Sequence, residues 1–346
     1  MWAWGCGNDG RLGLGEEEEA RPTPTKLGKQ LFGGYDVAMV ACGSTFTVAL
    51  NSVGAVWTWG AGPLGLGERQ RSLNPLCVNA AHFRGSRVAM IAAGVQHTLA
   101  ATIDGNVFAW GRNKCGRLGV GDEYDRRVPT AIERTKFQGD GKMLGRPISI
   151  LAAGFNHSVA VSVDGVLFSW GDGCSGKLGL GDRNQRLDPA LVGGVDMFWS
   201  PVIMAACGGA HTLAVTKEGA LFAWGYGGGG RLGTKDASNR LVPTRVRAQH
   251  LGNSKVVMAA AGSSHSSALT EEGALYTWGP GEIYAGAFKN AKIPVGLGHG
   301  DTQDKLVPAR VPVDGVRFGR CRRQVIYRVL RASVISGSLS TQGALY

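Results

Sequence analysis

Short apolar runs alternate with glycine-rich polar turns along almost the whole chain. Val88–Ala92 and Val256–Ala260 are typical, because each has the length of a β-strand and is bounded by turn residues. Elsewhere Asp104 and Gly105 separate two such runs, and Asp-Gly in that position is the strongest short-range signal of a β-hairpin. The pattern therefore predicts an all-β chain of short antiparallel strands with little helix.

A Trp-Gly pair marks each of six copies of a repeat, and neighbouring pairs stand 51 to 60 residues apart. The six tryptophans are Trp4, Trp59, Trp110, Trp170, Trp224 and Trp278. A glycine-rich turn, a proline and a small residue followed by Gly-x-x-His come after most of these pairs, in that order. The marker histidines are His97, His157, His211 and His265, and Phe46 takes this place in the first copy. The second copy is three residues short around Ala61–Leu64.

Each copy has the pattern of four short strands, and a single four-stranded sheet cannot bury both of its faces. Radial stacking buries them, with the tryptophan between neighbouring sheets, whereas a linear solenoid needs polar caps that neither end of the chain shows. We predict one β-propeller domain over residues 1–346. Its repeat units are about 2–53, 54–104, 105–164, 165–218, 219–272 and 273–342, and residues 343–346 begin or close a further blade.

The cycle Trp-Gly, Gly-x-Leu-Gly-x-Gly-Asp, Pro and Ala-Gly-x-x-His resembles the regulator of chromosome condensation (RCC) repeat, whose members form seven-bladed β-propellers. Six full copies stand here, so the resemblance implies seven blades only if a missing copy is restored. It also implies a non-enzymatic protein-interaction propeller, a scaffold or recognition module. The alternative is a guanine-nucleotide exchange factor for a Ran-like small GTPase, for which Asp9 and Asp172 are candidates for an acidic contact surface.

The repeated polar residues suggest structural roles rather than a reaction centre. One marker histidine per blade cannot bring several imidazoles to within ~2 Å of one metal ion, so we expect each imidazole to make a hydrogen bond to backbone that ties neighbouring strands. Asp122, Asp182, Asp236 and Asp301 occupy equivalent loops and are expected to accept hydrogen bonds from turn amides. No nucleophile elbow or phosphate-binding loop occurs. We expect no catalytic residue, no metal, no cofactor and no small-molecule substrate.

The sixth copy departs from the repeat. An eleven-residue insertion lies within Pro280–Pro294, and neither marker Gly nor marker His follows it. An insertion that a blade does not need is free to protrude and to bind a partner; decay of the copy is the competing explanation. The partner-binding candidates here are Glu282, Tyr284, Phe288, Lys289, Arg320, Arg322 and Arg323.

Composition and charge narrow the class of protein further. The 55 glycines without a three-residue period exclude collagen and agree with many tight turns, while 44% hydrophobic and 18% charged residues indicate a folded protein. The net charge of +11 favours an acidic partner, such as chromatin or an acidic protein surface. No apolar run approaches a membrane span, and the seven cysteines form no CxxC pair. We expect an intracellular protein of the cytoplasm or nucleus.

Overall fold

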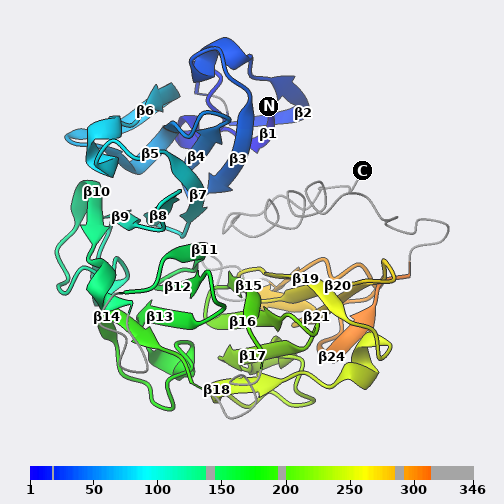
Figure 1. Ribbon diagram of the computed structural model, residues 1–346. Coiled ribbons are helices and arrows are strands. Elements are labelled where there is room, and N and C mark those ends of the chain that lie inside the picture. The colour runs from blue at the N-terminus through cyan, green and yellow to red at the C-terminus, as the bar shows by residue number, and fades with distance from the viewer. Residues whose placement is uncertain (18, 138–144, 194–199, 285–291, 313–346) are drawn as a thin grey trace.

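The computed structural model describes residues 1–17, 19–137, 145–193, 200–284 and 292–312. Within them the chain forms antiparallel strands joined by turns and by 3₁₀ segments of three or four residues, without an α-helix. Five four-stranded sheets follow one another around a common centre (Figure 1). The predicted β-propeller architecture with four-stranded blades is therefore confirmed.

Each sheet, or blade, consists of consecutive strands, except that β24 completes the last one. Blade 1 contains β3 (Val37–Cys42), β4 (Phe46–Asn51), β5 (Val56–Leu66) and β6 (Arg69–Cys77). Blade 2 contains β7 (Val88–Ala93), β8 (His97–Thr102), β9 (Val107–Gly111) and β10 (Arg126–Ile132). Blade 3 contains β11 (Ile148–Ala153), β12 (His157–Ser162), β13 (Leu167–Gly171) and β14 (Arg186–Leu191). Blade 4 contains β15 (Val202–Cys207), β16 (His211–Thr216), β17 (Leu221–Gly225) and β18 (Arg240–Arg245). Blade 5 contains β19 (Val256–Ala261), β20 (Ser266–Thr270), β21 (Leu275–Gly279) and β24 (Lys305–Arg310).

The blades are offset from the repeat in the sequence, because the strand that carries Trp-Gly is the third strand of its blade. The chain begins with this third strand: β1 (Trp2–Cys6) pairs with β2 (Ala20–Lys26) as a two-stranded sheet. β1 therefore holds the position of a third strand and β2 that of a fourth.

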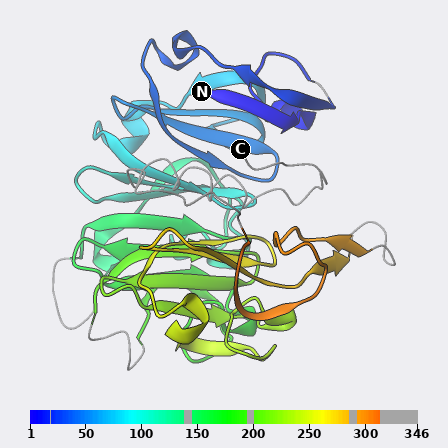
Figure 2. The same cartoon turned by 90° about the vertical axis from the view of Figure 1, so that its right-hand side faces the viewer.

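A second two-stranded sheet is formed by β22 (Glu282–Tyr284) and β23 (Lys292–Pro294). It lies within Pro280–Pro294, the segment that carries the eleven-residue insertion, and extends away from blade 5 (Figure 2). β21 pairs directly with β24, so the insertion contributes no strand to the blade.

The 3₁₀ segments stand at two kinds of position: between the third and fourth strands of a blade, and between one blade and the next. Those between the third and fourth strands are η1 (Asn8–Gly10), η4 (Lys114–Gly116), η6 (Cys174–Gly176) and η7 (Gly228–Gly230). Those that lead from one blade to the next are η2 (Lys29–Phe32), η3 (Ala80–Phe83), η5 (Arg134–Lys136) and η8 (Ala248–Leu251).

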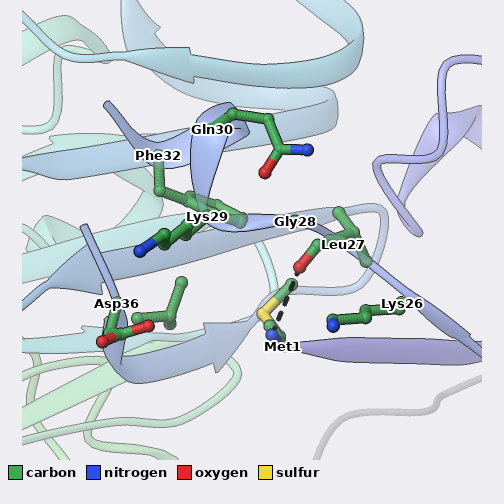
Figure 3. Close-up of a pocket in the computed structure, with 9 residues that line it drawn as sticks. Met1, Lys26, Leu27, Gly28, Lys29, Gln30, Phe32 and Asp36 are labelled. Atoms are coloured by element: carbon green, nitrogen blue, oxygen red, sulfur yellow. Dashed lines mark hydrogen bonds between the residues drawn. The ribbon is translucent and has the colours of Figure 1, made fainter. Parts of the chain in front are cut away.

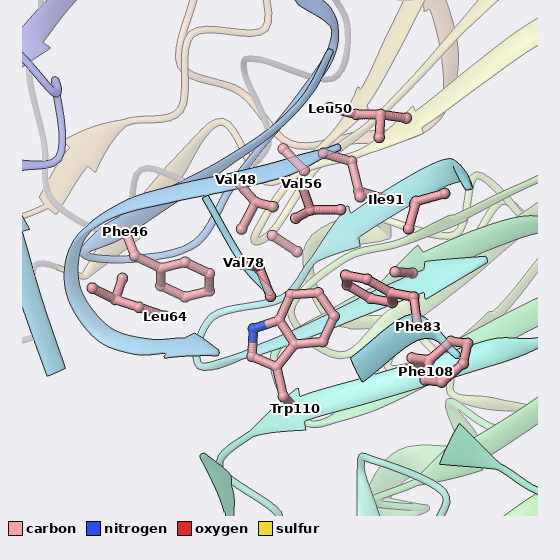
Figure 4. Close-up of a cluster of buried hydrophobic side chains, with 14 residues drawn as sticks. Phe46, Val48, Leu50, Val56, Leu64, Val78, Phe83, Ile91, Phe108 and Trp110 are labelled. Carbon is pink, nitrogen blue, oxygen red and sulfur yellow. The ribbon is translucent and has the colours of Figure 1, made fainter. Parts of the chain in front are cut away.

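The hydrophobic core lies in the seams between neighbouring blades. Between blades 1 and 2, valines and Leu50 of one blade face Ile91, Phe108 and Trp110 of the other (Figure 4). The repeat tryptophans from Trp59 onward are at most 1% exposed, as predicted, and Phe83 meets Trp110 edge-on at 6.2 Å between ring centroids. The seams, rather than the individual blades, therefore carry the apolar burial that stabilises the fold.

The close approach of neighbouring blades explains why the second glycine of Gly-x-Leu-Gly recurs in the repeat. Gly119 has φ +76°, and a Cβ on it would lie 2.7 Å from Trp170 Nε1 of the next blade. A side chain there would be strained by the backbone conformation and would also displace the tryptophan. The repeat motif thus records a contact between blades.

Candidate functional site

The marker histidines link one blade to the next. His157 Nε2 on β12 lies 3.0 Å from Thr212 Oγ1 on β16, and that hydroxyl donates to the Lys177 carbonyl at 2.8 Å. A hydroxyl that donates its one proton to a carbonyl must accept from the imidazole, so Nε2 carries the ring proton. The two neighbouring seams repeat this arrangement, with His97 at 2.9 Å from Ser158 and His211 at 2.9 Å from Ser266.

Burial keeps these imidazoles neutral. Desolvation, with a smaller effect of the Lys177 charge, lowers the pKa of His157 to about 3. Burial also lowers the pKa of His97 and His211 well below the usual value, with Arg117 and Arg231 adding to the effect. A neutral imidazole whose Nε2–H is donated to a hydroxyl is a structural group. No three histidine, cysteine or acidic side chains in the described residues lie close enough together to bind a metal.

The prediction for the hydrogen-bond partner of the marker histidines was wrong in one respect. A hydrogen-bonded, strand-linking role is present, but Nε2 bonds a hydroxyl of the next blade rather than the backbone of a neighbouring strand. The residue after a marker histidine, for example Ser158 or Thr212, accepts the hydrogen bond from the marker histidine of the preceding blade. The repeated dipeptide His-Ser or His-Thr was the sequence signal for this chain of contacts.

The seam between blades 1 and 2 lacks this network. Phe46 replaces the histidine, and Pro63 replaces the residue whose carbonyl accepts the hydroxyl in the other seams. Within the part of the chain that the structure describes, Thr98 Oγ1 and Trp110 Nε1 are buried without a hydrogen-bond partner. At the level of the marker residues these two blades are joined by apolar packing and by two hydrogen bonds to the Val95 carbonyl, from Ser44 N at 3.1 Å and from Ser44 Oγ at 2.9 Å.

We expect opposite effects on stability when threonine is replaced by valine in the seam that contains Thr212 and in the seam that contains Thr98. Thr212→Val keeps the shape of the side chain but leaves His157 Nε2 and the Lys177 carbonyl unpaired, so we expect a loss of about 1–3 kcal/mol of unfolding free energy. Thr98→Val removes a buried hydroxyl that has no partner, so it should be neutral or stabilising. Urea denaturation at pH 7.5 measures both; equal losses would contradict the role assigned to the hydroxyls.

The loop aspartates have the expected local role. Asp122 and Asp182 each accept a hydrogen bond at 2.9 Å from the amide two residues later. The second oxygen of each pairs with an arginine four residues later, at 2.5 Å for Arg126 and 2.6 Å for Arg186. Asp236 repeats the arrangement with Arg240, and Asp301 repeats it with Lys305 in place of an arginine. These bonds lower the pKa of the carboxyls. The prediction that these aspartates satisfy turn amides is confirmed.

The two acidic candidates of the exchange hypothesis lie in equivalent loops. Asp172 is only 15% exposed and pairs with Lys177 at 2.6 Å, which helps to lower the pKa of its carboxyl. Asp9 has φ 64°, pairs with Arg11 at 2.9 Å and is 40% exposed. Both carboxylates already have basic partners within their own loops, and a contact with a partner protein stays a prediction.

The candidates of the sixth copy fall largely outside the described residues. Glu282 is partly exposed at the start of β22, and the backbone of Tyr284 ends that strand. Phe288, Lys289, Arg320, Arg322 and Arg323 lie outside the residues that the structure describes. The structure thus places the base of the insertion on a separate two-stranded sheet, which had been expected only as a protruding segment.

A cleft of about 510 Å³ opens beside the first strand pair (Figure 3). Its floor includes the buried side chains Leu27 and Phe32, and Lys26, Lys29 and Asp36 stand at its polar side. These groups include no nucleophile with an adjacent base, which acyl or phosphoryl transfer would need.

The RCC1-like domain family matches residues 1–334. The chain belongs to this family. Arabidopsis thaliana ultraviolet-B receptor UVR8 is 39% identical over 319 residues, which cover 90% of this chain and 66% of the receptor. The RCC1 domain-containing protein RUG3, mitochondrial, also from Arabidopsis thaliana, is 34% identical over 283 residues, 81% of this chain and 61% of that protein.

Solved structures agree with this assignment. A chain in the crystal structure of Kap60 bound to yeast RCC1 (Prp20) is 27% identical with a TM-score of 0.72, over 90% of this chain and 71% of that one. This chain spans less than two thirds of the length of the two plant relatives. No helix among the described residues is long and apolar enough to cross a membrane.

Proposed function

We propose that this RCC1-like propeller is a non-enzymatic protein-interaction module, a scaffold or recognition domain for a protein partner. One observation carries the proposal: the repeated polar side chains are used to join blades, while the connection between the third and fourth strands in blades 1 and 5 departs from the 3₁₀ turn that blades 2, 3 and 4 share. A rigid scaffold with variable loops is the usual arrangement of a recognition domain. The net charge of +11 favours an acidic partner.

The insertion of the sixth copy is the contact surface that we propose. Among the described residues, β22 and β23 pair with each other and with no strand of blade 5. Contact of these two strands with a partner protein would therefore break no hydrogen bond between strands of the blade. The candidates in the insertion are Glu282, Tyr284, Phe288 and Lys289. Arg320, Arg322 and Arg323 are candidates from a later part of the sixth copy, and Asp9 and Asp172 are candidates on the loops of other blades. Aromatic and arginine side chains are the usual anchors of protein interfaces.

An intracellular location forms part of the proposal. The six cysteines in the described part of the chain are all free thiols, which persist in reducing compartments. Cytoplasm and nucleus are the compartments that we propose.

Removal of the insertion tests the proposed surface. Glu282 and Pro294 are cross-strand partners, so deleting residues 283–293 joins two positions that already lie side by side. The tagged chain and the deletion variant would be used to capture proteins, with mass spectrometry of what each recovers. We expect the melting temperature to stay within about 2 °C, because no strand of a blade is lost, and specific capture to disappear. Unchanged capture would contradict a role of the insertion and favour decay of the sixth copy.

Nucleotide exchange is the second candidate, and the structural likeness to yeast RCC1 is the observation that favours it. An exchange factor binds the nucleotide-free form of a GTPase more tightly and thereby accelerates GDP release. Release of labelled GDP from a panel of small GTPases separates the two functions. We expect no acceleration; an acceleration that Asp9→Asn or Asp172→Asn reduces would replace the scaffold proposal.

A further inference from the structure

The connection between the third and fourth strands of blade 1 differs from its equivalents. In blades 2, 3 and 4 a 3₁₀ segment stands there, and η4, for example, packs against the next blade. In blade 1 the strands β5 and β6 instead continue as a hairpin as far as the pair Leu66 and Arg69. The three residues missing around Ala61–Leu64 explain the change, since the 3₁₀ turn has no residues left to form it.

A basic side chain is missing from this seam as well. In the seam between blades 2 and 3, Arg117 Nη1 reaches the Phe155 carbonyl at 3.2 Å, and its Nε bonds the Lys114 carbonyl at 3.1 Å. Arg231 makes the same pair of contacts with Ser263 and Gly228. Pro63 takes this position in blade 1 and has no donor.

An open cleft of about 340 Å³ lies in this place. Pro63 and Glu68 of blade 1 line it, together with Gln96 and Arg127 of blade 2. The hairpin is fixed across the cleft, because Gly67 N donates to the Arg127 carbonyl at 3.1 Å and Glu68 pairs with Arg127. The cleft is therefore a built feature between two anchored elements.

Each arginine in the lining of the cleft has a carboxylate partner, and Arg112 is the one held most weakly. Three guanidinium groups line it, those of Arg112, Arg126 and Arg127, against the two carboxylates of Glu68 and Asp125. Arg126 is held by Asp122 at 2.5 Å, outside the lining. Arg112 is 64% exposed and lies 3.4 Å from Asp125, a longer contact than the 2.7–2.9 Å typical of a charge-assisted bond. Arg112 is thus able to take a second carboxylate.

We propose that this cleft binds a carboxylate side chain from an acidic peptide segment of a protein partner, with Arg112 as the principal contact. Asp125 stays in place because its Oδ1 accepts from the Asn113 amide at 2.8 Å, so an incoming carboxylate shares Arg112 rather than displacing Asp125. The side-chain amide of Gln96, which is exposed, supplies further donors. The net charge of +11 attracts such a segment over distance. This inference rests on the proposed interaction function and gives it a ligand class.

Fluorescein-labelled hexaglutamate is the probe, with hexaglutamine and hexalysine as its comparisons, in fluorescence anisotropy at 50 mM salt. We expect hexaglutamate alone to bind, and Arg112→Gln to weaken it at least tenfold. Arg183→Gln is the matched control, because Arg183 is an exposed arginine in the equivalent loop of blade 3 and should change affinity less than twofold. Absence of binding to the parent protein, or equal weakening by both substitutions, would overturn the proposal in favour of diffuse charge attraction.

A graft tests the geometry without removing a charge from the lining. Residues 61–64 would be replaced by the seven-residue segment 172–178 of the third copy, which restores the regular length and supplies the 3₁₀ turn. We expect the graft to fill the cleft and abolish hexaglutamate binding with an unchanged or higher melting temperature. Binding that survives in a folded graft would show that the cleft is not the site. Deletion of residues 283–293 should leave hexaglutamate binding intact, so failure of the insertion as a partner surface and failure of this cleft are distinguishable.

Discussion

Lowering the pH from 6.5 to 5 is expected to destabilise the protein steeply through His97, His157 and His211. Unfolded imidazoles titrate near pH 6.5, whereas the folded pKa of His157 is about 3 and those of the other two are also well below normal. The unfolded state therefore binds more protons below pH 6.5. The stability that these groups contribute is complete above that pH and is lost as the pH falls toward the folded values.

The expected size follows from the same shift. Each histidine contributes up to about 1.4 kcal/mol per pH unit, so three together give a slope of up to about 4 kcal/mol per pH unit. The loop aspartates, whose pKa values are lowered, titrate at more acidic pH and affect this window little. Urea denaturation at half-unit intervals of pH measures the slope directly.

A single substitution separates the histidine effect from the rest. His157→Gln should reduce the slope by up to about 1.4 kcal/mol per pH unit while lowering stability at pH 7.5, because glutamine does not titrate. His82→Gln, on the partly exposed η3 segment, is the matched control for the same change of side chain and should leave stability at pH 7.5 nearly unchanged. A slope near zero in the parent protein would show that the imidazoles are not buried as neutral groups.

Trp170→Ala is expected to cost about 3–5 kcal/mol of unfolding free energy, the range for deleting a large buried aromatic side chain. Trp170 is fully buried, packs on Phe137 at 6.0 Å between ring centroids and donates to the Arg117 carbonyl at 2.9 Å. Its removal leaves a cavity in the seam between blades 2 and 3 and an acceptor with one partner fewer. Thermal and urea denaturation at pH 7.5 measure the loss.

Trp4→Ala tests the same position of the repeat in another environment. Trp4 is 57% exposed on β1, so its truncation should cost less than about 1 kcal/mol. A loss as large as that of Trp170→Ala would mean that the Trp4 face is covered in solution. Equal, small losses for both substitutions would instead contradict the burial of Trp170 in a seam.

The repeat in the sequence was enough to predict the class of fold. Trp-Gly, the glycine-rich turn and Gly-x-x-His recur in fixed order, and this periodicity alone indicates a repeat architecture, while the Asp-Gly turns between apolar runs are local signals of β-hairpins. The same local logic predicted the turns at Asp122 and Asp182, because an aspartate that bonds the amide two residues later needs no distant partner.

Contacts between blades could not be predicted in the same way. His157 and Thr212 are 55 residues apart in sequence, and only the stacking of two blades brings the imidazole to the hydroxyl. The missing residues near Pro63 were visible as a shorter copy, but their consequence, an open cleft lined by Arg112 and Arg127, depends on which elements face each other across a seam. Hydrogen bonds within a turn are encoded locally, whereas the environment of a side chain between blades is decided by packing, and this is why the tertiary structure alone located the candidate site.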